Sequence, residues 1–140
     1  MRRSCGIGLL IGLATGLWMW GEYALGFHTT HADIGRFTGF LSVIFPILGM
    51  VWALRLARSH HGQLGFRSGM GHVVAVSLGA TLSMTLMSAT YAAWLHPRWL
   101  ESSGTSMSTF LLQSATSTLI GGVVVGAIAI FFMRTQRTTP

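Results

Sequence analysis

Hydrophobic and polar residues follow one another in long blocks along this chain. Apolar runs cover residues 5–27, 37–57, 70–95 and 110–133, and short polar segments separate them. A helix rises about 1.5 Å per residue and the hydrocarbon core of a bilayer is about 30 Å thick, so each run is long enough to cross a membrane as a helix. The pattern predicts an all-α polytopic membrane protein in which four transmembrane helices form one bundle, with residues 1–140 as a single domain.

The arginines predict how this bundle is oriented. Seven of them lie near the chain ends or in the second connection, namely Arg2, Arg3, Arg55, Arg58, Arg67, Arg134 and Arg137. Only Arg36 and Arg98 lie in the first and third connections. Because positively charged residues favour the cytoplasmic side of a membrane, the distribution predicts that both termini and the middle connection are cytoplasmic.

Composition narrows the class of protein further. The chain is 51% hydrophobic and 9% charged, with a mean hydropathy of +0.58, which is typical of membrane proteins. The formal charge of +6 would suit nucleic acid, but the arginines flank the apolar runs and form no basic stripe with interleaved aromatic residues. We therefore expect the lipid bilayer as a partner, and no nucleic acid.

Small residues mark two helix faces. Gly8, Gly12 and Gly16 repeat every four residues in the first run, and Gly122 and Gly126 do so in the fourth. Such spacing places small residues on one face and lets another helix approach closely. These faces join either two copies of the chain or helices within one bundle. We favour packing within the bundle, because its four helices must already pack against each other.

Glu22 is the acidic residue with the clearest functional potential. The three acids are Glu22, Asp33 and Glu101, and the predicted topology places all of them at or near the outer face. A carboxylate near the end of a transmembrane run needs a partner or water, so it is a candidate for transport or gating. The alternative is an interfacial residue that pairs with Arg36 or a nearby histidine.

Two features predict local structure inside the second and third runs. Pro46 removes a backbone donor near the middle of the second run and predicts a kink there. Hydroxyl side chains follow one face of the third run: Ser77, Thr81, Thr85 and Ser88. They either bond to carbonyls within the bundle or form part of a polar path for a solute.

Histidines on the predicted outer side offer a metal site as another hypothesis. His28, His31 and His96 gather there, and imidazoles are good ligands for zinc, copper or iron. The alternative is that they are ordinary surface histidines. We expect no bound cofactor and no enzymatic activity, since no G-x-S-x-G, H-E-x-x-H or glycine-rich phosphate loop is found.

The middle of the chain resembles a known family. The resemblance rests on Arg55 and Arg58 at the end of an apolar run, Gly-Gln-Leu-Gly-Phe at 62–66, Gly69 or Gly71 opening the next run, and Tyr91, Pro97, Trp99 and Glu101 closing it. With these features the chain resembles a bacterial family of four-span membrane proteins called domain of unknown function 4199. The resemblance implies a protein of the bacterial inner membrane and supplies no activity. Gly65 departs from it, because a small hydroxyl residue is expected there.

These features support three hypotheses of function. The first is a small integral inner-membrane protein without enzymatic activity, an accessory or scaffold subunit within a homodimer or a larger membrane complex. The second is a small homodimeric transporter or channel that uses Glu22. The third is an outer-face metal-binding or sensing protein that uses His28, His31 and His96.

Overall fold

A computed structural model of the chain describes residues 1–61 and 65–135, apart from the side chains at 32, 36, 60, 61, 99, 101, 134 and 135. The described residues form helices and no strands, which confirms the all-α prediction. In chain order these are α1 (Arg2–Ala24), α2 (Ala32–Leu41), α3 (Ile44–His61), α4 (Phe66–Thr90), the π-helical turn η1 (Tyr91–Leu95), α5 (Pro97–Ser103) and α6 (Met107–Thr135).

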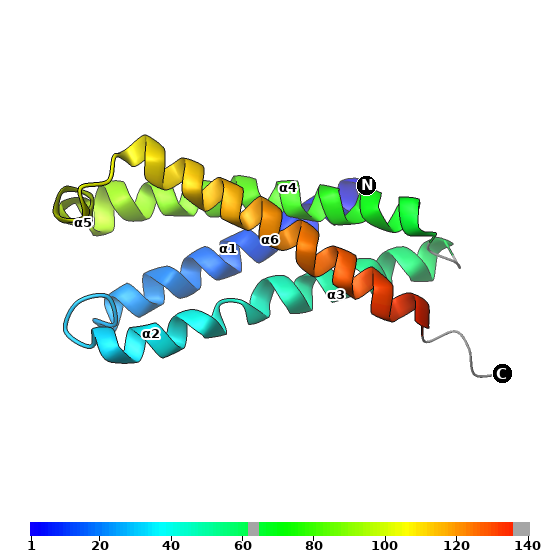
Figure 1. Cartoon of the computed structure of the whole chain (residues 1–140), viewed down its shortest axis with the longest axis horizontal. Coiled ribbons are helices and arrows are strands. Elements are labelled where there is room, and N and C mark those ends of the chain that lie inside the picture. Colours follow the sequence, from blue (N-terminus) through cyan, green and yellow to red (C-terminus); the bar gives the residue numbers. More distant parts are fainter. Residues whose placement is uncertain (62–64, 136–140) are drawn as a thin grey trace.

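The long helices run up and down and give the molecule two distinct ends (Figure 1). The start of α1, the end of α3, the start of α4 and the end of α6 lie at one end, which we call the terminal end. The turn after α1, the start of α2 and all of α5 lie at the other, which we call the α5 end. Residues far apart in the sequence therefore meet at each end of the bundle.

Four helical segments are long and apolar enough to cross a membrane. They are Arg2–Ala24, Asp33–Ser59, Phe66–Leu95 and Met107–Met133, each within a few residues of a predicted apolar run. Large apolar side chains such as those of Leu10, Leu82 and Phe132 are exposed on their outer faces. Exposed apolar faces are expected of helices that lipid surrounds, so the architecture is that of a polytopic membrane protein.

The second span is broken upstream of the kink that Pro46 predicts. α2 ends at Leu41, and α3 begins at Ile44, two residues before the proline. Pro46 thus lies in the first turn of a new helix, where a missing N–H costs least. Hydrogen bonds of the 3₁₀ type bridge the break. The N–H groups of Ser42 and Val43 donate to carbonyls three residues earlier, at 3.3 and 3.2 Å, instead of four residues earlier.

The glycine faces of the first and last spans both lie against α4 of the same chain. A Cβ atom at Gly12 would lie 2.5 Å from the Ala80 carbonyl oxygen and 2.9 Å from the Met84 nitrogen. In α6, a Cβ atom at Gly122 would lie 2.6 Å from Ser77 Oγ. The helix backbones approach this closely only because these positions carry no side chain. α4 is therefore the central helix of the bundle.

The apolar core occupies the half of the bundle nearest the terminal end. It consists of buried side chains from all four spans: Ile7, Ile11, Met50, Ala53, Leu54, Val73, Val76, Ala80 and Ile130. In an up-and-down bundle, early residues of α1 and α4 meet late residues of α3 and α6, which explains this placement. The half nearest the α5 end contains the buried polar residues Glu22 and Ser88 beside Met87, Tyr91 and Ala92.

Candidate functional site

Glu22 lies in the last turns of α1 and is only 6% exposed. The chain reverses directly after α1, because Gly26 adopts a positive φ of 77°, which a residue without Cβ adopts readily. The Phe27 N–H donates to the Glu22 carbonyl at 2.9 Å, and the His31 N–H donates to the Gly26 carbonyl at 2.8 Å. This turn folds the following residues back over the end of α1 and covers the Glu22 carboxylate.

A chain of polar contacts leads from Glu22 to the end of the third span. His28 Nε2 lies 3.6 Å from Glu22 Oε2, and His28 Nδ1 lies 2.7 Å from the Tyr91 hydroxyl oxygen. The same hydroxyl lies 3.4 Å from His96 Nδ1. A hydroxyl donates one hydrogen bond and accepts others, so Tyr91 can link the two imidazoles.

The π-helical turn η1 brings Tyr91 and His96 to the same side of the third span. In a regular α-helix, residues five apart point about 140° away from each other. Here the His96 N–H donates to the Tyr91 carbonyl at 3.0 Å, which is the five-residue bond of a π-helix. The wider turn places the two side chains together, and single π-turns are often found at functional sites.

Tyr23 completes what we call the Glu22 cluster: Glu22, Tyr23, His28, Tyr91 and His96. Its ring lies edge-on to Tyr91 with centroids 5.6 Å apart, and 5.1 Å from the ring of His96. The cluster joins the end of α1, the turn after it and η1. Its acid, imidazole and phenol groups lie close together, with His28 hydrogen-bonded to Tyr91 and 3.6 Å from the Glu22 carboxylate, and groups of these kinds can relay protons.

A cavity of about 360 Å³ lies on another side of Glu22. Its wall includes Trp18 and Glu22 of α1, Phe27 of the following turn and Phe45 of α3. The rings of Trp18 and Phe45 lie 5.9 Å apart. Glu22 Oε1 and Trp18 Nε1 are buried without a hydrogen-bond partner among the described residues. Glu22 thus lines this cavity beside aromatic rings, while its Oε1 atom is enclosed by the protein.

The histidines named as metal ligands do not form one set. His28 and His96 meet through Tyr91, whereas His31 is exposed and precedes the first turn of α2. Among the side chains that the structure describes, no group of three His, Cys, Asp or Glu residues is arranged to hold a metal ion. The side chain of Glu101, the acid that follows His96, lies outside the described part.

The hydroxyls of the third span divide into two kinds. Ser88 Oγ lies 3.0 Å from Ser114 Oγ of α6, whereas the hydroxyls of Ser77, Thr81 and Thr85 are buried without a partner among the described residues. Ser77 also lines an interior cavity of about 240 Å³, where it is joined by Thr15, Ser42, Ser117 and Thr118 from the other spans. The hydroxyls that surround this cavity come from every span, not from one helix face.

Sequence reasoning named Glu22, His28 and His96 but missed Tyr23 and Tyr91 as parts of the site. Tyr91 served only to support the family resemblance. Regular helical periodicity places Tyr91 and His96 on different faces, so the π-turn conceals their proximity. The signal available in the sequence was an acid followed by an aromatic residue at the end of an apolar run.

Comparison with known proteins gives one family. The profile described as Protein of unknown function (DUF4199) matches residues 7–118, a wider region than residues 55–101, whose features carried the resemblance. No curated protein and no solved structure matches the chain. The matched region includes every member of the Glu22 cluster, from α1 to the residue after η1. The chain belongs to the DUF4199 family of proteins of unknown function.

Proposed function

We propose that this protein is a small membrane transporter for organic cations that uses Glu22 as its proton-coupling acid. One observation carries the proposal: the buried Glu22 carboxylate lies between an aromatic-walled cavity and a chain of titratable side chains. A buried acid inside a transmembrane segment is costly and is usually retained for a function.

The cavity has the chemistry of a cation site. Aromatic faces attract cations through their quadrupoles, and a carboxylate supplies the opposite charge. Trp18, Phe27 and Phe45 provide the rings, and Glu22 provides the charge. The volume of about 360 Å³ lies within the range of small-molecule sites, about 300–1,000 Å³. An organic cation with an apolar body suits this wall better than a hydrated metal ion.

The Glu22 cluster provides the route for the protons that the transporter would exchange for the organic cation. A carboxylate in an apolar environment is stable when it is protonated or paired with a cation. A proton and an organic cation would therefore compete for the same carboxylate. His28 touches Glu22 on one side and Tyr91 on the other, and 27% of its side chain remains exposed. His28 can therefore carry protons between Glu22 and the aqueous phase at the α5 end.

Uptake of a labelled cation tests this function. We expect proteoliposomes with an imposed pH gradient to accumulate benzyltrimethylammonium, and Glu22→Gln to lower that uptake about tenfold or more, because loss of a buried charged partner costs about 1.5–3 kcal/mol. Asp33→Asn is the matched control, since Asp33 is an exposed acid at the same end. Uptake that is absent, or that Glu22→Gln leaves unchanged, would contradict the proposal.

We propose in addition that both termini lie in the cytoplasm of a bacterium, with the bundle in its inner membrane. The arginine distribution and the family resemblance support this orientation. Reporter fusions after Asp33 and after Ser103 should then respond to the outer compartment, and one after Gly65 to the cytoplasm. The reverse pattern would place the Glu22 cluster on the cytoplasmic side.

The accessory or scaffold role and the homodimer stay predictions. The glycine faces that suggested an assembly pack against α4 within one chain, so a partner would have to use other surfaces. The outward faces of α3 and α6 carry exposed apolar side chains, including Leu48, Trp52, Ile120 and Val124. A partner in the membrane would have to use exposed apolar surfaces of this kind.

A further inference from the structure

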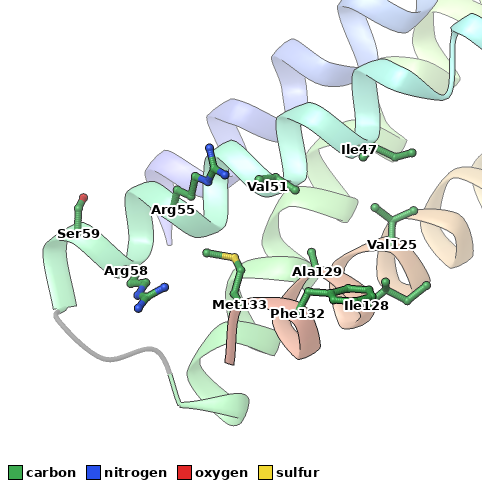
Figure 2. Close-up of a pocket in the computed structure, with 10 residues that line it drawn as sticks. All are labelled: Ile47, Val51, Arg55, Arg58, Ser59, Val125, Ile128, Ala129, Phe132 and Met133. Atoms are coloured by element: carbon green, nitrogen blue, oxygen red, sulfur yellow. The ribbon is translucent and has the colours of Figure 1, made fainter. Parts of the chain in front are cut away.

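A groove separates α3 from α6 near the terminal end (Figure 2). The Glu22 cluster lies at the other end of the bundle. Its volume is about 810 Å³. Val51 of α3 and Val125, Ile128 and Phe132 of α6 give it an apolar wall within the two spans. The groove opens between helices that are exposed to lipid, so an acyl chain can enter from the side.

Two arginines stand at one end of this groove. Arg55 and Arg58 are one helical turn apart on α3 and both line the groove. Figure 2 shows the Arg58 side chain toward Met133 and the Arg55 guanidinium turned in another direction. They lie in the last turns of a membrane-spanning segment that ends at Ser59, the depth at which lipid headgroups begin. The groove therefore combines an apolar body with a cationic rim at headgroup level.

The acidic residues of the chain lie away from this rim. Glu22 and Asp33 lie at the α5 end, and Glu101 belongs to α5. The contact between an acid and a basic side chain that the structure describes joins Glu22 to His28, at the opposite end from Arg55 and Arg58. A phosphate group can supply the negative charge that the described side chains do not place here.

We infer that this groove binds an anionic glycerophospholipid, with its phosphate at Arg55 and Arg58 and one acyl chain between α3 and α6. Arginine binds phosphate through parallel N–H groups, and basic pockets between transmembrane helices are sites for anionic headgroups. The apolar wall continues from the arginines toward Ile47, along the direction in which the chain of such a lipid runs.

Charge argues against a second copy of the chain as the occupant. A second copy in the same membrane orientation would bring its own arginine-rich end to the rim. The lipid site does not depend on the proposed transport function, because no member of the Glu22 cluster lines the groove.

Lipid retention in native mass spectrometry tests the inference. The full chain is reconstituted with equal amounts of phosphatidylglycerol and phosphatidylcholine and is then released gently. We expect bound phosphatidylglycerol to exceed phosphatidylcholine about tenfold, and the Arg55→Gln, Arg58→Gln double variant to lose this preference.

The matched control removes the same charge elsewhere at the terminal end. Arg2 and Arg67 are exposed and lie outside the groove, so the Arg2→Gln, Arg67→Gln double variant should keep the preference. The Arg55→Lys, Arg58→Lys double variant keeps the positive charge and should therefore retain part of the preference for phosphatidylglycerol. A misfolded protein would retain none of it. Equal loss of the preference in both glutamine variants would show general attraction to an anionic bilayer and would contradict the proposed site. No loss in either variant would contradict it as well.

Discussion

Replacing Gly12 with alanine is expected to destabilise the bundle by about 2 kcal/mol or more, because the added methyl group meets backbone atoms of α4. Its Cβ would lie 2.5 Å from the Ala80 carbonyl oxygen and 2.9 Å from the Met84 nitrogen. Backbone in a packed helix cannot give way as a flexible side chain does, so α1 and α4 must separate. The separation weakens packing along the whole interface, beyond the neighbourhood of residue 12.

Gly6 provides the control within the same helix. A Cβ at Gly6 meets nothing within 4 Å, so Gly6→Ala should gain the helix propensity of alanine, about 1 kcal/mol, without a clash. Unfolding of both variants in detergent, followed by far-ultraviolet circular dichroism, measures the difference. If Gly12→Ala proves as stable as Gly6→Ala, α1 does not pack against α4 at this distance.

Replacing Leu54 with alanine is expected to cost about 2 kcal/mol or more. Leu54 of α3 is 0% exposed and lies within the apolar core. Lipid tails are as apolar as leucine, so little of this cost comes from transfer out of water. It comes from the cavity that remains, whose lining atoms no longer have a neighbour to attract them by dispersion.

Leu48 of the same helix is the matched control for Leu54. It is 63% exposed and faces outward, so Leu48→Ala opens no cavity and should change stability by about 0.5 kcal/mol or less. The same detergent titration compares the two variants. Equal effects would mean that α3 has no inward face in this region and would contradict the core described above.

The hydrophobic blocks were sufficient to predict the fold. The errors lie in local features that hydrophobicity does not report, namely the break in the second span and the short helix α5. The four spans follow from apolar length alone, because lipid requires each helix to satisfy its own backbone groups. The break at Ser42 was misplaced because Pro46 signals a disturbance without showing that a new helix begins just ahead of it. The helical structure of α5 was missed because a segment of seven mostly polar residues carries no long-range pattern.

The site was predicted in part, by its charged members. An acid within an apolar run stands out in any sequence, so Glu22 was found directly. Its neighbours were harder to predict, because a turn at Gly26 folds His28 back and a π-helical turn changes the direction of His96. Each depends on backbone geometry that hydrophobic periodicity does not contain. The same limit applies to the lipid groove, whose arginines were interpreted as topology signals and as features of the family resemblance.

The break between α2 and α3 shapes the cavity beside Glu22. Two rings of the cavity wall stand on either side of it, Phe27 before α2 and Phe45 at the start of α3. The N–H groups of Ser42 and Val43 bond three residues back instead of four, so the second span is not one regular helix there. The separation of the two rings therefore depends on the angle at which α2 meets α3.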